Sequence, residues 1–299
     1  MLHNPLITIF TPTYNRALTI KALYDSLIGQ TNANFEWIIV DDGSQDDTVR
    51  IVNGFIAENK VKIIFKIQEN SGKHIAINRG AQLARGELFF VVDSDDYLLP
   101  DALERAQYHW NDVLSLPFDE RKHIIGIAAN RVYPTGKIVG NEPRYNILDT
   151  DLLTYRFKHK YKGDKAELYL TDILKQNPFP QIENETFCPE ALIFYRLADK
   201  GMNLRFVNEN FYVCDYLVGG LTLSGIKTIQ RGPIASLQSY ADMVGFNKVP
   251  FLTRIKYGIL YWRFSFLNKK QSIRTKINML PSPLYTALYP FGYFYHLRD

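Results

Sequence analysis

Short, mostly apolar runs alternate with helical patterns along the first part of the chain. Four runs are expected to be strands, namely residues 6–10, 37–40, 61–65 and 88–92. Between them, apolar residues recur every three or four positions, which predicts helices over 17–30, 46–59 and 72–85. Strands that are apolar on both faces and alternate with helices are typical of a mostly parallel sheet that is covered on both sides. The pattern therefore predicts an α/β fold.

Each predicted strand runs directly into, or leads to, a polar segment. These segments are residues 11–16 (TPTYNR), 41–44 (DDGS), 70–74 (NSGKH) and 93–96 (DSDD). In open parallel sheets, ligands bind beyond the carboxyl ends of the strands. The four segments are therefore expected to converge on one edge of the sheet and to line a ligand pocket.

The second half of the chain has fewer clear patterns. Residues 101–115 are expected to form a helix, and 124–139 a hairpin that turns at Pro134-Thr135-Gly136. Pro189 near its start and Gly201 just past its end predict a helix over 189–200. Residues 216–226 contain three glycines and are a candidate for a loop that closes over a ligand.

Composition narrows the class of protein. With 46% hydrophobic and 22% charged residues, the chain has the composition of a globular protein. Two cysteines, Cys188 and Cys214, are too few for a disulfide framework and favour a reducing compartment. The first residues lack the features of a secretory signal, and no stretch reaches the about 18 apolar residues of a membrane-spanning helix. A cytoplasmic location is expected.

Charge is distributed unevenly along the chain. Residues 251–299 carry eight Lys or Arg and one acid, so their net charge is +7, whereas residues 1–250 carry −3. The same C-terminal stretch holds twelve aromatic residues. Bases, aromatic residues and an apolar helical face are combined in helices that lie on membrane surfaces. A pair of helices packed on the preceding domain would also account for this stretch, and both interpretations stay open here.

Asp93-Ser94-Asp95 is the sharpest chemical feature. Residues two apart in an extended chain point to the same side, so both carboxylates would meet just past a buried strand. Mg²⁺ and Mn²⁺ prefer such oxygen ligands and commonly bridge a carboxylate to substrate phosphates. A solvated acidic turn, or a cap of the following helix, is the alternative interpretation.

Two other polar segments suit a nucleotide diphosphate. A carboxylate of Asp41-Asp42 can bind a base or ribose, although a tight turn with Ser44 or Asp46 capping the next helix would have the same sequence. Gly72-Lys73-His74 opens a predicted helix, where amide groups and a lysine favour an anion. Neither GxGxxG after the first strand nor GxxxxGK[ST] is present, which disfavours a dinucleotide oxidoreductase and a P-loop enzyme.

Taken together, residues 11–16, 40–48, 70–87 and 91–101 resemble the inverting glycosyltransferases of family 2, which have the GT-A fold. The resemblance implies a nucleotide-sugar donor, for example a UDP-sugar, bound with Mn²⁺ or Mg²⁺. It implies that the nucleotide-sugar site contains Thr11, Tyr14, Asp42, Lys73 and Asp93. It also implies that Asp95, with Asp93 beside it, holds the metal.

Inversion by direct displacement needs a base that deprotonates the acceptor hydroxyl. Residues 187–192 (FCPEAL) resemble an F-x-P-E segment of bacterial polysaccharide glycosyltransferases, which makes Glu190 the candidate catalytic residue. An acid in a first helical turn is also favoured by the helix dipole alone. Asp164-Lys165 and Gly219-Gly220 look like the same subgroup, without an assigned role. The QxxRW motif of processive synthases is absent, so one sugar per encounter is expected.

The sequence thus predicts a GT-A domain over 1–230, with a nucleotide-sugar half (1–110) and an acceptor half (111–230), and a helical extension over 231–299. Expected partners are the donor and a saccharide or lipid-linked saccharide acceptor of bacterial surface polysaccharide synthesis, but no nucleic acid. Two other classes remain: a non-catalytic nucleotide-sugar-binding protein, and a sugar-1-phosphate nucleotidyltransferase. The latter would have a glycine-rich loop after the first strand, and residues 11–16 contain no glycine.

Overall fold

The computed structural model describes residues 5–214, 225–268 and 271–296. Their packing divides the chain into two compact units. The first unit comprises residues 1–151, 161–178 and 201–216, and the second comprises 152–160, 179–200 and 217–299. This division follows contacts rather than chain order, and the predicted domain boundary at residue 230 stays a prediction.

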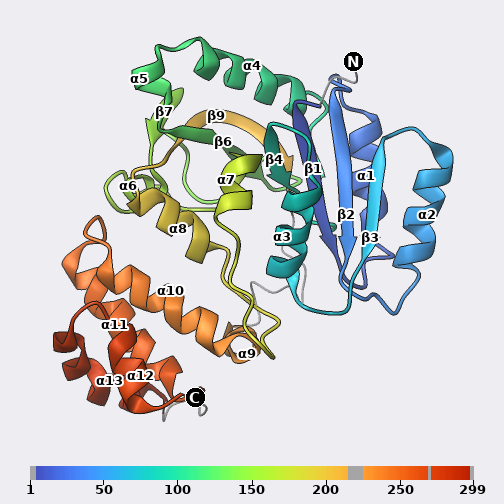
Figure 1. Ribbon diagram of the computed structural model, residues 1–299. Helices are drawn as coiled ribbons and strands as arrows, with labels where there is room; N and C mark the ends of the chain where they lie inside the picture. The colour runs from blue at the N-terminus through green and yellow to red at the C-terminus, as the bar shows by residue number, and fades with distance from the viewer. Residues whose placement is uncertain (1–4, 215–224, 269–270, 297–299) are drawn as a thin grey trace. The chain divides into compact units, whose positions relative to one another are not determined.

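The first unit is built on one mixed sheet (Figure 1). Within the described residues it has nine strands in the order β3-β2-β1-β4-β8-β6-β9-β5, with β7 also paired to β9. The strands are β1 Ile7–Thr13, β2 Phe35–Asp41, β3 Ile63–Ile67, β4 Leu88–Val91, β5 Tyr97–Leu98, β6 Ile124–Val132, β7 Ile147–Thr150, β8 Lys165–Leu170 and β9 Asn203–Val213. The predicted mostly parallel part is confirmed, because β3, β2, β1 and β4 run parallel to one another.

Helices cover both faces of this sheet. In Figure 1, α3 lies in front of β1 and β2, and α1 lies behind the sheet. The helices of the first unit are α1 Ile20–Ile28, α2 Thr48–Glu58, α3 Lys73–Leu83, α4 Ala102–Ser115, α5 Phe118–Arg121 and α7 Thr171–Gln176. The predicted helices over 17–30, 46–59, 72–85 and 101–115 are therefore confirmed, with ends that differ by at most three residues. The predicted hairpin is present as a turn that brings Ile138 back to Val132.

The apolar strands form the core because their side chains are buried on both faces. Ile9, Trp37 and Phe90 are completely buried in one cluster with residues of α1, α2 and α4. On the other face, α3 approaches β1 very closely at Gly80, where an added Cβ would lie 2.2 Å from the ring of Phe10. Glycine therefore sets the distance between α3 and the sheet, and with it the position of the residues that open this helix.

Strand register brings the polar segments to one edge. Thr13 of β1 is paired with Asp41 of β2, and Phe10 of β1 is paired with Val91 of β4. Because the strands are parallel, their carboxyl ends lie side by side at this edge. The predicted convergence of the segments that follow β1, β2 and β4 is confirmed.

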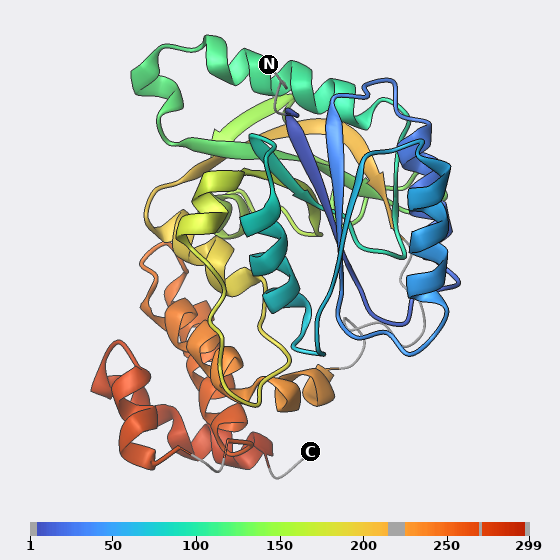
Figure 2. The ribbon, with the colours of Figure 1, turned by 45° about the vertical axis from the view of Figure 1, so that its right-hand side comes forward.

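The second unit is helical (Figure 2). Its helices are α6 Leu152–Phe157, α8 Ala191–Asp199, α9 Gly225–Arg231, α10 Pro233–Gly245, α11 Phe251–Ser265, α12 Ile273–Met279, the 3₁₀ helix η2 Pro283–Leu288 and α13 Tyr289–His296. Tyr261, Trp262 and Leu237 form the centre of a separate apolar cluster. The predicted C-terminal helical extension is thus confirmed. Among the described residues, no helix is both long and apolar enough to cross a membrane.

Candidate active site

Asp42 anchors the loop that precedes α3. Its carboxylate, which is almost fully buried, accepts hydrogen bonds from the backbone N–H groups of Ser71 (2.8 Å) and Gly72 (2.9 Å) and from the side chain of Gln68 (2.8 Å). Gly72 adopts a positive φ of 95°, which only glycine tolerates readily. The loop is therefore fixed at the point where α3 begins with Lys73.

Lys73 reaches across to the segment that follows β4. Its ammonium nitrogen lies 2.6 Å from a carboxylate oxygen of Asp93, and both side chains are about one quarter exposed. Burial alone would raise the pKa of Asp93, but the positive charges of Lys73, Arg131 and Arg16 outweigh that effect and hold the pKa below its usual value. Asp93 is consequently a carboxylate, with partial access to solvent, at the carboxyl edge of the sheet.

Residues 93–96 form a turn, referred to here as the acidic turn. The N–H of Asp96 donates to the carbonyl of Asp93 (3.2 Å), and the N–H of Asp93 donates to the hydroxyl of Tyr212 (3.0 Å). That hydroxyl in turn donates to Asp96 (2.7 Å). One tyrosine from β9 therefore holds both ends of the turn, and Asp95 lies between them with its side chain about one quarter exposed.

Asp96 differs from Asp93 and Asp95 because it is buried. Desolvation, together with the charges of Asp93 and Asp95, raises the pKa of Asp96 to about 7, although the hydrogen bond from Tyr212 opposes the rise. Arg131 is paired in register with Tyr212 across β6 and β9, and its guanidinium lies 4.3 Å from the centre of the tyrosine ring. The guanidinium thus provides a partly buried positive charge beside the acidic turn.

The loop after β1 contributes exposed groups to the same edge. Arg16 lies 4.0 Å from a carboxylate oxygen of Asp95, and the side chain of Tyr14 is 45% exposed. Asn15 adopts a positive φ of 53° and exchanges hydrogen bonds with Ser44 and Gln45. These bonds join the loops after β1 and β2, so that Tyr14 and Arg16 are held next to the other polar segments.

The turn after β2 has a structural function as well. The carboxylate of Asp41 accepts hydrogen bonds from the N–H groups of Gly43 (3.2 Å) and Ser44 (2.8 Å), as expected for a tight turn. Asp46 accepts from the N–H of Thr48 at the start of α2 (3.0 Å). The predicted turn is confirmed, and Asp46 binds the first N–H group of α2, although the N-cap residue is Asp47, which makes no capping bond. Asp42 is directed towards the next loop.

The donor set at this edge fits a hard divalent cation by its chemistry. Asp93 and Asp95 present carboxylate oxygens, and Asp96 is committed to Tyr212. Among the described residues, no three or more His, Cys, Asp or Glu side chains are grouped to hold a metal ion. Two carboxylates with water and substrate phosphates are nevertheless an ordinary ligand set for Mg²⁺. The ligand set of such an ion would therefore be completed by the substrate rather than by the protein alone.

The remaining predicted residues lie as follows. Thr11 is completely buried, and its hydroxyl accepts a hydrogen bond from the indole of Trp37 (2.9 Å), so its nucleotide contact stays a prediction. Glu190 is the N-cap residue of α8 in the second unit, whereas the acidic turn belongs to the first, and its function as a base also stays a prediction. Lys165 is buried and donates to Asn130 (2.7 Å). Gly219-Gly220 lies outside the described residues.

Arg131 and Tyr212 were not assigned a function from the sequence, and neither was Asp96. Asp96 directly follows the predicted metal ligands, so its position along the chain was a usable signal. No local pattern marks Arg131 or Tyr212, because they reach the acidic turn only through the pairing of β6, β9 and β5.

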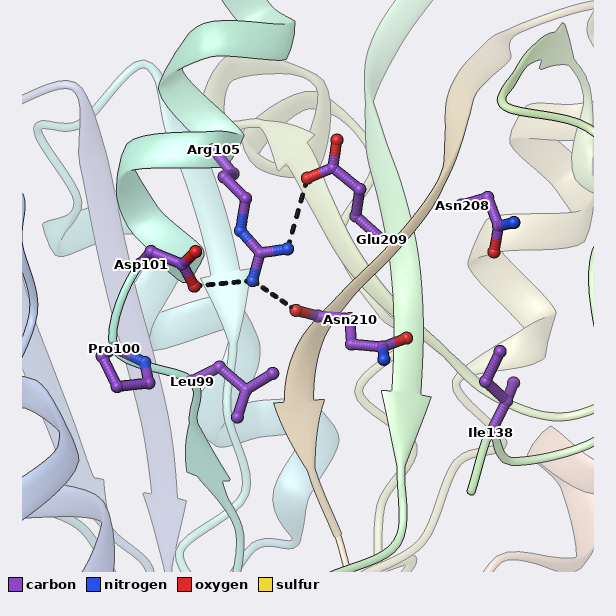
Figure 3. A pocket seen from close by; sticks show the side chains of 8 residues that line it. All are labelled: Leu99, Pro100, Asp101, Arg105, Ile138, Asn208, Glu209 and Asn210. Atoms are coloured by element: carbon purple, nitrogen blue, oxygen red, sulfur yellow. Dashed lines mark hydrogen bonds and ion pairs between the residues drawn. The ribbon is translucent and has the colours of Figure 1, made fainter. Parts of the chain in front are cut away.

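A pocket of about 540 Å³ lies elsewhere in the first unit (Figure 3). It is lined by Leu99, Pro100, Asp101, Arg105, Ile138, Asn208, Glu209 and Asn210. The guanidinium of Arg105 binds Asp101 (2.7 Å), Glu209 (3.3 Å) and the carbonyl of Asn210 (2.6 Å). This pocket shares no residue with the predicted nucleotide-sugar site, and both terminal nitrogens of its arginine are engaged in these contacts.

Comparison with known proteins identifies relatives for the half of the chain that carries the acidic turn. The sequence model of the family described as glycosyl transferase family 2 matches residues 8–160, which is 153 of the 299 residues. A chondroitin synthase of Escherichia coli is 39% identical over 112 residues, which cover 38% of this chain and 16% of that protein. The chain spans less than half the length of the curated relatives it matches first.

Solved structures extend the likeness to almost the whole chain. Residues 1–349 of TarS from S. aureus, in complex with UDP-GlcNAc, superpose with a TM-score of 0.63 and 18% identity over 96% of this chain and 79% of that one. The mannosyltransferase PcManGT from Pyrobaculum calidifontis, in complex with GDP-Man and Mn²⁺, gives a TM-score of 0.59 and 17% identity over 99% and 88%. At such low identity the likeness shows the fold, and the predicted GT-A fold is confirmed.

Proposed function

We propose a reaction for this chain, which belongs to glycosyl transferase family 2 and is a glycosyltransferase. It moves one sugar from a nucleotide diphosphate to an acceptor hydroxyl, with inversion and with help from a divalent metal. The observation that carries this proposal is the pairing of cations and carboxylates at one sheet edge. Lys73 lies against Asp93, and Arg16 lies near Asp95. The carboxylates suit a metal ion, and the two cations suit a diphosphate.

Asp95 and Asp93 are the proposed metal ligands, and Mn²⁺ or Mg²⁺ is the proposed ion. When bound, such an ion neutralises the negative charge of a departing diphosphate. Lys73 and Arg16 supply further positive charge next to Asp93 and Asp95, respectively. Because Lys73 and Arg16 already balance Asp93 and Asp95, a divalent ion and a diphosphate can enter together without leaving an uncompensated charge.

The donor is proposed to be a UDP-sugar, with Tyr14, Asp42 and Lys73 in the nucleotide-sugar site. Tyr14 is the most exposed of these side chains and can stack on a base. Asp42 acts mainly by fixing the loop that carries Lys73. The TarS structure with UDP-GlcNAc and the PcManGT structure with GDP-Man support a nucleotide-sugar donor in this fold.

Glu190 is the proposed base that accepts the proton of the acceptor hydroxyl. It opens α8, and its side chain is partly buried. The acceptor oxygen that this base deprotonates would attack the anomeric carbon from the face opposite the departing diphosphate, which inverts that carbon. The acceptor is proposed to be a saccharide or lipid-linked saccharide of a bacterial surface polysaccharide, with the enzyme in the cytoplasm and residues 251–299 at the inner face of the cell membrane.

The test is release of UDP from UDP-sugars by the purified chain with Mn²⁺, with Mg²⁺ and with a chelator. Turnover is expected only with the metals, and Asp95→Ala should abolish it without lowering the melting temperature. Asp119→Ala serves as the control, because this carboxylate is largely exposed on α5. Full turnover in the presence of the chelator would refute the proposed metal requirement.

Two further measurements separate an enzyme from a binding protein. Glu190→Gln is expected to lower kcat by about 100-fold or more while the donor still raises the melting temperature. Anomeric configuration of the product, read by NMR, should be opposite to that of the donor. Donor binding without any turnover in the unmodified chain would favour a non-catalytic nucleotide-sugar-binding protein.

A further inference from the structure

α13 exposes an unusual number of aromatic side chains. Its eight residues include five tyrosines and phenylalanines, and all five are between 38% and 66% exposed: Tyr289, Phe291, Tyr293, Phe294 and Tyr295. These five side chains are called the aromatic surface below. Leu284 in the preceding η2 is 84% exposed and continues the same stretch of chain. Exposed apolar groups gathered in this way usually mark a binding surface.

The packing of α13 explains why its rings face outward. The helix contacts α11 through Gly292, where an added Cβ would lie 2.4 Å from the side chain of Trp262. Gly292 is the buried residue of this helix. Tyr289 and Tyr293 lean with their edges on Trp262 and Phe266, at centroid distances of 5.1 and 5.5 Å. A helix that docks through a glycine buries little of its own aromatic area, so the fold of the second unit leaves Phe291 and Phe294 without cover.

The surroundings of the aromatic surface are positively charged. In the sequence, no Asp or Glu lies between Asp242 and Asp299, while residues 251–299 carry eight Lys or Arg. Arg263 of α11 places its guanidinium 6.0 Å from the centre of the Tyr295 ring. Lys256 and Arg274 are exposed on α11 and α12. Any partner of this part of the protein is therefore expected to be anionic.

The kind of anionic partner follows from where the bases and rings lie. α13 contains neither Lys nor Arg, so its most exposed side chains can enter an apolar layer while the bases of α11 and α12 stay among charged groups. A protein surface that binds nucleic acid would instead need Lys or Arg side chains on the helix that it presents, to contact the phosphates. A second copy of the chain would bring two positively charged surfaces together, which is unfavourable.

We infer that the aromatic surface of α13 inserts into the headgroup region of an anionic lipid bilayer, with the bases of α11 and α12 on the lipid phosphates. An eight-residue helix is much too short to span a bilayer, so it lies in the plane of the interface. This inference rests on the membrane contact of residues 251–299 proposed above, and its test needs no sugar transfer.

The test is flotation of the full chain with vesicles of phosphatidylcholine alone and with vesicles that contain phosphatidylglycerol. The full chain should float with the phosphatidylglycerol vesicles and less with the neutral ones, and added salt should weaken binding. The double variant Phe291→Ala, Phe294→Ala should bind the phosphatidylglycerol vesicles at least roughly tenfold more weakly than the unmodified chain. The matched control is Tyr108→Ala, Phe118→Ala, which removes two rings that are each 69% exposed in the first unit and should change nothing.

The remaining outcomes each overturn the inference. No flotation of the unmodified chain, or equal flotation of the Phe291 and Phe294 variant, excludes insertion of α13. Equal binding to neutral vesicles excludes the proposed function of the bases. If the unmodified chain is a dimer and the Phe291 and Phe294 variant is a monomer, the aromatic surface is an interface between copies. If the unmodified chain binds a single-stranded oligonucleotide more tightly than vesicles, the partner is a nucleic acid. Equal melting temperatures of both variants establish that neither result reflects unfolding.

Discussion

The ammonium group of Lys73 lies 2.6 Å from a carboxylate oxygen of Asp93, which joins the first residue of α3 to the acidic turn after β4. The pair is only partly buried, so a phosphate or a cation from solvent can compete for either member. The contact therefore holds both side chains in position in the absence of a ligand. It also makes Lys73 the most direct probe of the proposed diphosphate site.

Replacement of Lys73 by alanine is expected to weaken donor binding. A hydrogen bond to a charged group contributes about 1.5–3 kcal/mol, so kcat/KM for the donor should fall by roughly 10- to 100-fold, mostly through KM. Steady-state kinetics with a UDP-sugar measure this effect. Lys66→Ala, which removes an exposed lysine of β3, is the control and should leave the kinetics unchanged. A loss confined to kcat would argue that Lys73 does not bind the donor.

Tyr212→Phe tests whether one hydroxyl holds the acidic turn. The variant removes a hydrogen bond from the N–H of Asp93 and another to the buried carboxyl of Asp96, and should cost about 1–3 kcal/mol of unfolding free energy. The Mn²⁺ concentration for half-maximal activity is expected to rise, because Asp93 and Asp95 are less well positioned. Tyr169→Phe, which loses a hydrogen bond to Glu167, should leave the Mn²⁺ requirement unchanged. The same Mn²⁺ requirement in Tyr212→Phe would contradict the prediction.

Gly80→Ala is expected to destabilise the protein, although alanine normally favours a helix by about 1 kcal/mol over glycine. At this position the new methyl group would lie 2.2 Å from the ring of Phe10, and such overpacking costs about 1–3 kcal/mol. Gly54→Ala in α2 is the matched control, because no atom lies within 4 Å of the added Cβ, and it should be stabilising. Urea denaturation measures both changes. Stabilisation by both substitutions would show that α3 can move away from β1 without cost.

Glu36→Gln is expected to lower stability in a pH-dependent way. The side chain of Glu36 is completely buried, and although burial opposes its charge, hydrogen bonds from the backbone and side chain of Arg85 and from Thr8 lower its pKa. A lowered pKa means that its stabilisation is complete above the ordinary value of about 4.3 and is lost as the pH falls through the folded-state pKa. The variant should lose about 1–3 kcal/mol at pH 7, and less at pH 3.5.

Urea denaturation at the two pH values measures this difference, and Glu120→Gln is the control, because its side chain is exposed on α5. A stability loss for Glu36→Gln that is the same at pH 7 and pH 3.5 would show that the charge of Glu36 is irrelevant.

Much of the parallel half of the fold could be predicted because its signals are local. The apolar run of β1 and the helical spacing of α1 and α3 depend on residues that are close in sequence, and burial of an apolar run is favourable wherever it is placed. The edge at which Asp42, Lys73 and Asp95 meet then follows from the rule that parallel strands share their carboxyl ends. The insertion of the antiparallel β8 between β4 and β6 had no such signal.

What the sequence determined by itself is the order of strands and helices over residues 6–92, the polar segments at the sheet edge and the excess of positive charge in residues 251–299. Tertiary structure alone decided that Tyr212 bonds both ends of the acidic turn, that Arg131 covers this tyrosine, and that the rings of α13 remain exposed. The physical reason is that periodicity and charge are properties of neighbouring residues. Hydrogen bonds across β5, β6 and β9, and the exposure left by a glycine contact, depend on which distant segments pack together.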